Sequence, residues 1–197
     1  MNTSFKRVTV FCASSKKTPE IYVNAARKVA QTLLAKNAHV YYGGGAVGLM
    51  GVIADEYLKN NGKITGVIPE FMVKVEWAHP SVKDMRVVKD MHERKKQLVA
   101  DSDIVLALPG GTGTLEELME VISLKRLGKF NKPIIILNTN GFYNPLNEFL
   151  HHMVADQFIR KEHLNLWQTI CIPEDFWEVA NNAEDWDEES INIAGVF

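Results

Sequence analysis

The chain has 197 residues, of which 46% are hydrophobic and 23% are charged, and its 22 basic and 24 acidic residues leave a formal charge of −2. Length and composition are those of a single globular domain, and the near-neutral balance argues against a nucleic-acid partner, which needs a concentrated basic surface. No apolar run approaches the roughly 18 residues of a membrane span, and the opening Met-Asn-Thr-Ser-Phe-Lys lacks the apolar core of a secretory signal.

Short apolar strands and amphipathic helices alternate through the first half of the chain. Thr18 precedes Pro19, which predicts a helix N-cap followed by a proline whose missing N–H costs nothing at the first helical position. Residues 70–83 have no clean period and predict a loop with a short helix. The expected strands are residues 7–12, 39–42 and 63–68, the last of which ends at Pro69, and the expected helices are residues 18–37 and 47–58.

The same alternation continues in the second half. Residues 103–108 and 133–137 are continuous apolar runs, typical of strands that are buried on both faces. Such strands, separated by helices, predict one doubly wound α/β domain over residues 1–197, a parallel sheet with helices on both faces. The other expected strands are residues 85–88 and 168–172, and a short helix follows the second of them. The expected helices are residues 90–100, 114–127 and 144–158, and Asp90 is the expected N-cap of the first. Residues 184–189 are expected to form an acidic, peripheral tail.

Two glycine-rich loops each follow a predicted strand and precede a predicted helix. The first spans residues 43–51 and includes Gly44 and Gly45, and the second is Pro-Gly-Gly-Thr-Gly-Thr at 109–114. Sheets of this type bind ligands beyond the carboxyl ends of their strands, where free N–H groups at a helix start attract anions, so we expect both loops to hold a phosphate. The alternative is that the glycines only make tight turns. The first loop also fits G-x-G-x-x-G, with Glu70 as ribose partner of a dinucleotide, but it follows the second strand rather than the first.

The helix that starts at Met91 carries cations where apolar residues belong. Met91, Arg94, Lys95 and Leu98 share one helical face, so burial of the apolar pair draws both cations towards the core. Unpaired buried charges are costly, and therefore a bound phosphate or a carboxylate is expected beside them. Alternatively, the helix is rotated and both cations reach solvent.

Glu117 is the expected carboxylate, because it directly follows the second glycine loop. It has a structural alternative, since Thr114 and Glu117 also fit a capping box in which Glu117 bonds the Thr114 backbone. Ser14 and Ser15 follow the first strand and can either donate to ligand oxygens or begin the turn before the next helix.

Aromatic, histidine and cysteine residues give weaker signals. Trp77 and His79 either stack on a base or simply pack, and Phe71, Met72 and Trp77 are candidates for the pocket lining that sets the base preference. The six histidines and the two cysteines have no metal-ligand spacing. The two cysteines, Cys12 and Cys171, are also too few for a disulfide framework. We therefore expect no metal site and a reducing, cytoplasmic setting.

Three motifs in order resemble those of one family. Residues 109–117 fit P-G-G-x-G-T-x-x-E, residues 91–95 read Met-His-Glu-Arg-Lys, and residues 43–51 fit G-G-G-x-x-G-L-M-G. Together they resemble the LOG family, the cytokinin riboside 5′-monophosphate phosphoribohydrolases, which were long described as lysine decarboxylases. The resemblance covers roughly residues 8–158. One departure is Ala13, in a Cys-Ala-Ser-Ser turn that is more usually C-G-S-S, which weakens the assignment of Ser14 as a ligand.

The resemblance implies a Rossmann-like domain that forms a homodimer, with Arg94 and Glu117 as the catalytic pair. It also implies substrate contacts at Glu76, Lys95, Gly110, Gly111, Thr112, Gly113, Thr114 and Glu116.

The implied reaction is hydrolysis of the N-glycosidic bond of AMP or an N6-substituted purine riboside 5′-monophosphate, without a metal or redox cofactor. Glu117 would stabilise the oxocarbenium-like transition state or attack the anomeric carbon. Arg94 would hold substrate and lower the pKa of Glu117. Two alternatives are a nucleotide-monophosphate-binding module without catalysis and a pyridoxal-phosphate-dependent lysine decarboxylase, for which no Schiff-base lysine can be identified.

Overall fold

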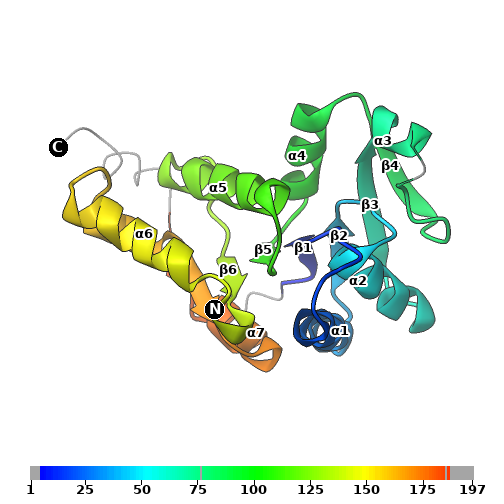
Figure 1. Cartoon of the computed structure of the whole chain (residues 1–197), viewed down its shortest axis with the longest axis horizontal. Helices are drawn as coiled ribbons and strands as arrows, with labels where there is room; N and C mark the ends of the chain where they lie inside the picture. The colour runs from blue at the N-terminus through cyan, green and yellow to red at the C-terminus, as the bar shows by residue number, and fades with distance from the viewer. Residues whose placement is uncertain (1–4, 76, 185, 187–197) are drawn as a thin grey trace.

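A parallel sheet of seven strands, in the order β4-β3-β2-β1-β5-β6-β7, forms the centre of the protein (Figure 1). The computed structural model describes residues 5–75, 77–184 and 186. Every neighbouring pair of strands is parallel, which confirms the predicted sheet. The strands are β1 (Arg7–Phe11), β2 (His39–Tyr42), β3 (Ile64–Pro69), β4 (Asp84–Val88), β5 (Ile104–Ala107), β6 (Ile134–Leu137) and β7 (Gln168–Ile170).

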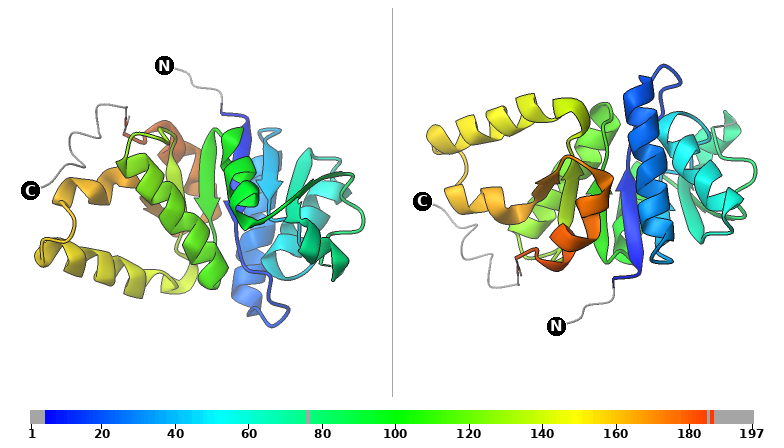
Figure 2. Two further views of the ribbon diagram at one scale, coloured as in Figure 1. Left: turned by 90° about the horizontal axis from the view of Figure 1, so that it is seen from above. Right: turned by 90° about the horizontal axis from the view of Figure 1, so that it is seen from below.

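Helices cover both faces of this sheet. Helices α1 (Glu20–Leu34), α2 (Gly48–Lys59) and α7 (Phe176–Asn181) lie on one face, and α4 (Met91–Ala100), α5 (Thr112–Arg126) and α6 (Asn144–Ala155) lie on the other (Figures 1 and 2). Short elements complete the connections: α3 (Glu70–Lys74), η1 (Thr139–Gly141), η2 (Lys161–Leu166) and η3 (Pro173–Asp175). Within the described residues, no helix is both long and apolar enough to cross a bilayer.

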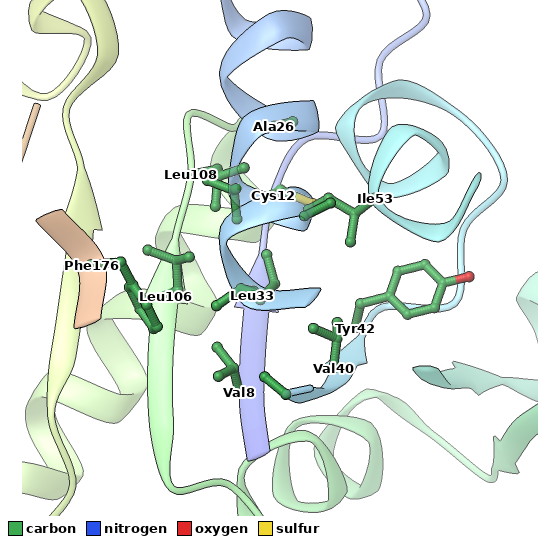
Figure 3. Close-up of a cluster of buried hydrophobic side chains, with 14 of the residues drawn as sticks. Val8, Cys12, Ala26, Leu33, Val40, Tyr42, Ile53, Leu106, Leu108 and Phe176 are labelled. Atoms are coloured by element: carbon green, nitrogen blue, oxygen red, sulfur yellow. The ribbon is translucent and has the colours of Figure 1, made fainter. Parts of the chain in front are cut away.

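Two apolar clusters, one on each face of the sheet, make up the core. The first joins the sheet to α1, α2 and α7, and Figure 3 shows its central side chains, among them Val8, Leu33 and Phe176. The second packs α4, α5 and α6 on the opposite face and includes Phe11 and Leu118. Alternate residues of each central strand therefore enter opposite clusters, which is why these strands are apolar on both faces.

The order of the strands creates a crevice at the carboxyl edge of the sheet. The chain runs outward from β1 to β4 and then returns to β5, which pairs with β1 on its other side. A ligand site is expected where the strand order reverses in this way. The loops after β1, β2 and β5 meet there: the Ala13 amide donates to the Pro109 carbonyl (3.3 Å), and the Met50 amide donates to the Ala13 carbonyl (3.2 Å).

The helix starts differ in part from the predictions. Asp90 accepts a hydrogen bond from the Glu93 amide (2.9 Å) and caps α4 as predicted. Thr18 does not cap α1, because its hydroxyl donates to the Ser15 carbonyl (2.8 Å) and Pro19 occupies the N-cap position. Helix α5 begins at Thr112, two residues earlier than predicted.

Candidate active site

A buried ion pair joins α4 to α5 at the carboxyl edge of the sheet. The Arg94 Nη1 donates to Glu117 Oε1 at 2.8 Å, and each residue is only 5% exposed. The alternative in which Arg94 reaches solvent is therefore wrong. Glu117 is the anionic partner of this buried cation, as predicted from the high cost of burying an unpaired charge.

Two carbonyls complete the surroundings of the Arg94 guanidinium. Its Nε donates to the Val67 carbonyl on β3 (3.1 Å), and its Nη2 donates to the Gly43 carbonyl after β2 (3.3 Å). A side chain at Gly43 would collide with the guanidinium, because a Cβ built there would lie 2.1 Å from Nη2. Glycine at this position therefore allows Arg94 to reach the crevice, a role that sequence reasoning missed.

Burial dominates the electrostatics of Glu117. Desolvation raises the pKa of this carboxyl, the positive charge of Arg94 opposes the rise, and the neighbouring Glu116 adds to it. The net pKa is above the ordinary value of 4.5. Arg94 lowers the pKa as expected, but the loss of solvent around the buried carboxyl outweighs this contribution.

The capping-box alternative for Glu117 is also wrong. Because Gly111 is the N-cap of α5, Thr114 lies inside the first turn, where its buried side chain packs against Gly110. Glu117 instead directs its carboxylate to Arg94 on the neighbouring helix.

Cys12 lies beside this pair at the end of β1 and is fully buried. Burial raises the pKa of its thiol strongly, and the negative charge of Glu117 raises it further, while Arg94 opposes the rise. The thiol therefore stays protonated at neutral pH and acts as a small apolar group rather than as a nucleophile.

The second glycine loop leaves open space in front of the N-terminus of α5. A Cβ built at Gly111 or at Gly113 would meet nothing within 4 Å, and neither glycine has a positive φ. Nothing in the fold therefore requires glycine at these exposed positions. Backbone N–H groups of a helix start, with room for an anion in front of them, make a phosphate site.

Gly113→Ala tests whether this space belongs to a ligand. Alanine in the first turn of α5 should raise the free energy of unfolding by up to about 1 kcal/mol, because glycine is the poorer helix former. If a phosphate docks there, the added methyl displaces it, and we expect kcat/KM for the reaction that the family resemblance implies to fall at least about tenfold. Thermal unfolding and base release measure the two effects. Ser123→Ala, at another exposed position of α5, is the control; unchanged kcat/KM in Gly113→Ala would contradict the assignment.

Packing accounts for the glycines of the first loop. Gly44 has a φ of +78° and lies against Met85 and Ile68, while a Cβ at Gly45 would crowd Met50. Gly48, with a φ of +64°, lies against the backbone between Ser14 and Ser15. The interpretation of this loop as a set of tight turns is therefore supported, and phosphate binding by Gly44 and Gly45 stays a prediction.

Ser14 is exposed and lies between the two glycine loops. Its neighbour Ala13 bonds the Pro109 carbonyl at the second loop, and Gly48 of the first loop lies against the Ser14 backbone. Ala13, which replaces the more usual glycine, is not among the described residues with a positive φ, so alanine fits this turn without backbone strain.

Lys95 forms ion pairs beside Glu117 with two other carboxylates. Its Nζ lies 2.6 Å from Glu116 Oε1 and 3.1 Å from Glu120 Oε2. Hydrogen bonds to these carboxylates, first that of Glu116, raise the pKa of the Lys95 ammonium. Both Lys95 and Glu116, which were expected to contact substrate, therefore lie at the rim of the site and pair with each other.

The segment 77–79 is attached to the first glycine loop. Ala78 forms an antiparallel bridge with Gly45, and the His79 amide donates to the Gly44 carbonyl (2.9 Å). His79 is buried, with Nε2 3.2 Å from Asp55 Oδ1, whereas Trp77 is 59% exposed. His79 therefore packs as expected, but Trp77 does not. Glu76, an expected substrate contact, lies outside the described residues.

Comparison with known proteins places the chain in a family. A family model described as "Possible lysine decarboxylase" matches residues 50–179. LOGL2 of Oryza sativa subsp. japonica, named a probable cytokinin riboside 5′-monophosphate phosphoribohydrolase, is 42% identical over 160 residues, which cover 81% of this chain and 66% of LOGL2. The cytokinin riboside 5′-monophosphate phosphoribohydrolase LOG5 of Arabidopsis thaliana is 40% identical, over 85% of this chain and 73% of LOG5. The chain belongs to the LOG family.

The fold of this LOG-family chain is shared with more distant solved structures. The molybdenum cofactor binding protein from Rippkaea orientalis has a TM-score of 0.68 at 20% identity, covering 90% of this chain and 96% of that protein. The molybdenum cofactor carrier protein of Chlamydomonas reinhardtii has a TM-score of 0.67 at 16% identity, covering 91% and 98%. These likenesses show a common Rossmann-like architecture.

The LOG-family motifs thus converge on one edge of the sheet. Arg94 and Glu117 form its centre, and the glycine turn of α5 lies on one side. The sequence did not predict that the Val67 carbonyl accepts a hydrogen bond from Arg94 or that Gly43 leaves room for the guanidinium, because no sequence motif indicates either contact. Among the described residues, no group of three or more His, Cys, Asp or Glu side chains could hold a metal ion; a reaction without metal stays a prediction.

Proposed function

We propose that this protein hydrolyses the N-glycosidic bond of a purine riboside 5′-monophosphate and releases the free base and ribose 5-phosphate. The observation that carries the proposal is the buried pair of Arg94 and Glu117, 2.8 Å apart, beside an open glycine turn at a helix start. The names of the LOG relatives, which are 40–42% identical to this chain, support the same reaction.

The 5′-phosphate binds at the N-terminus of α5 in this proposal. The exposed segment Gly111–Thr112–Gly113 presents backbone N–H groups to open space, and the positive end of the helix dipole favours an anion there. Binding energy from the phosphate is remote from the bond that breaks. It can therefore orient the ribose over Glu117 and lower the barrier rather than only tighten binding.

Glu117 acts on the anomeric carbon. As the bond from this carbon to the base nitrogen breaks, its electron pair leaves with the base and positive charge develops on the ribose ring. An ionised Glu117 stabilises that charge, either electrostatically or as a covalent ester. Water supplies the hydroxyl of ribose 5-phosphate and the proton that the base takes up. Arg94 orients the carboxylate and opposes the rise in its pKa.

The two alternative functions predict different chemistry. A decarboxylase that uses pyridoxal phosphate needs a lysine amine to form the Schiff base. Lys95, the lysine beside Glu117, has a raised pKa because of Glu116 and Glu120, and so stays a protonated ammonium. A module that only binds nucleotide has no need of a buried carboxylate beside its phosphate site, because burying that charge is costly.

Base release from the full chain tests the proposal. We expect incubation with AMP or isopentenyladenosine 5′-monophosphate to yield base and ribose 5-phosphate in equal amounts, separated by chromatography. Calorimetry with the same nucleotides measures binding. Binding without any base release would support the non-catalytic module instead, and release of carbon dioxide from lysine would support the decarboxylase.

We also propose that the chain works as one domain, as a homodimer and in the cytoplasm. A single sheet running from Arg7 to Ile170 supports one domain. The apolar side chains of residues 121–130 are candidates for a dimer interface, but Val121, Ile122 and Phe130 are buried in the core and only Leu127 is exposed. Leu127 and the exposed Phe149 and Phe158 are therefore the candidate interface residues, and sedimentation equilibrium would measure the mass of the assembly. Both cysteines are free, and an exposed thiol at Cys171 suits a reducing compartment.

A further inference from the structure

A buried tyrosine holds the backbone at the base of the second glycine loop. Tyr143 is the N-cap residue of α6 and is only 4% exposed. Its hydroxyl donates a hydrogen bond to the Leu108 carbonyl at 2.8 Å, across 35 residues of sequence. Burial raises the pKa of the Tyr143 phenol, which therefore stays protonated and able to donate. Leu108 directly follows β5 and precedes the glycine turn of residues 109–114, so this bond fixes the point from which the turn starts.

The outer part of this turn has no side-chain packing to hold it. Residues 111–113 are exposed, and a Cβ built at either glycine among them would meet nothing within 4 Å. The two carbonyls before the turn are held from outside it: that of Leu108 accepts from the Tyr143 hydroxyl, and that of Pro109 accepts from the Ala13 amide at 3.3 Å. The direction of the N–H groups at the start of α5 therefore depends on these two hydrogen bonds.

The segment between β6 and α6 fixes the position of Tyr143 in turn. Asn138 is buried, its Oδ1 accepts from the Tyr143 amide at 2.7 Å, and its Nδ2 donates to Asn144 Oδ1 at 2.8 Å. Between these residues the chain reverses through Asn140 and Gly141, which have φ values of +54° and +69°. A left-handed conformation is unfavourable for asparagine relative to its usual backbone, and the hydrogen bonds of Asn138 hold the segment in it. A chain of hydrogen bonds therefore runs from Asn138 through Tyr143 to the glycine turn.

We propose that Tyr143 is a positioning residue for phosphate binding, which acts through the Leu108 carbonyl to orient the N–H groups at the start of α5. The proposal rests on the proposed hydrolase function and adds to its site a side chain that does not touch the substrate. N–H groups that already point at the anion bind it more tightly than groups that must be ordered on binding. A phosphate held about 1 Å out of place can cost as much as about 10²-fold in rate, because it also misplaces the ribose.

Tyr143→Phe tests the proposal, since it removes the hydroxyl and retains the ring. Tyr57→Phe is the matched control: Tyr57 is also fully buried, and its hydroxyl donates to the Ala38 carbonyl at 3.1 Å, directly before β2 and so at the opposite edge of the sheet. Each variant loses one buried hydrogen bond, so both should lower Tm by a similar amount, about 2–4 °C. Only Tyr143→Phe should also lower kcat/KM for AMP, by about tenfold or more.

Calorimetry with ribose 5-phosphate and with adenosine separates positioning of the phosphate turn from general damage. Tyr143→Phe should weaken binding of ribose 5-phosphate about tenfold and leave the affinity for adenosine, which has no phosphate, unchanged. Equal affinities for ribose 5-phosphate in Tyr143→Phe and Tyr57→Phe would overturn the proposal, and so would an equally large loss of affinity for adenosine. If the wild-type protein binds ribose 5-phosphate but releases no base, the hydrolase function fails and the same affinities still test Tyr143. A wild-type protein that does not bind ribose 5-phosphate would overturn the proposal.

A second variant acts on the same chain of hydrogen bonds. Asn138→Ala removes the acceptor of the Tyr143 amide and should weaken binding of ribose 5-phosphate in the wild-type background. In the Tyr143→Phe background it should weaken this binding little further, because the two residues act through one contact. Full additivity of the two effects would contradict the role of Tyr143.

Discussion

Glu117→Gln is expected to lower kcat for base release about 10³-fold, in line with the loss of one buried group that stabilises charge in a transition state. Glutamine keeps the size of the side chain and can still accept a hydrogen bond from Arg94. It cannot neutralise the positive charge that develops on the ribose, and it cannot attack the anomeric carbon. Chromatographic measurement of adenine released from AMP under single-turnover conditions separates this chemical step from product release.

A matched substitution controls for this loss of charge. Glu148→Gln makes the same chemical change at an exposed position of α6, a helix that contributes no residue to the candidate site, and should retain the wild-type rate. Glu117→Gln should also bind AMP, because the phosphate turn is intact. A Glu117→Gln protein with a rate near that of the wild type would contradict the role of this carboxylate.

The pH dependence of kcat/KM should reflect the raised pKa of Glu117. Glu117 must be ionised to stabilise positive charge, and its pKa lies above 4.5 because the side chain is buried. As the pH falls through this raised pKa, the carboxylate is protonated, and kcat/KM should fall at a higher pH than an exposed glutamate would give. The residual rate of Glu117→Gln should lack this acid limb.

Arg94→Met is expected to destabilise the protein by about 3–5 kcal/mol at neutral pH, because it leaves the Glu117 carboxylate buried without its partner. Two carbonyls, those of Val67 and Gly43, also lose their donor. Without the opposing charge of Arg94, the pKa of Glu117 must rise further. Urea unfolding of the full chain measures the change in the free energy of unfolding, and base release should be lost with it.

The pH dependence of that destabilisation has a definite sign. A carboxyl with a raised pKa holds its proton more tightly in the folded state than in the unfolded state. Stability is therefore highest at low pH and falls as the pH rises from about 4.5 to the raised pKa of the folded state. Arg94→Met should thus lose less stability at pH 5 than at pH 8. The double variant Arg94→Met/Glu117→Gln, which contains no buried charge, should recover part of the loss; equal losses in the single and double variants would contradict the ion-pair explanation.

The sequence predicted the elements that depend on local pattern. Continuous apolar runs such as residues 133–137 identified strands buried on both faces, because a strand covered by helices on two sides needs no polar alternation. Asp90 identified the start of α4, since capping involves a residue only three positions away. Thr18 fits the same local rule but bonds the Ser15 carbonyl instead, because a hydroxyl at a turn has several possible partners.

By itself, the sequence determined the parallel α/β architecture, the glycine turn before α5 and the identity of the two charged residues, since all of these depend on neighbours within a few positions. Only the tertiary structure decided how they combine. Arg94 bonds Glu117, Val67 and Gly43 at separations of 23, 27 and 51 residues, and no spacing rule reaches that far. The protonation of Glu117 depends on the same assembly: the helices that bring Arg94 to it also exclude water, and this desolvation, rather than the ion pair, determines the direction of its pKa.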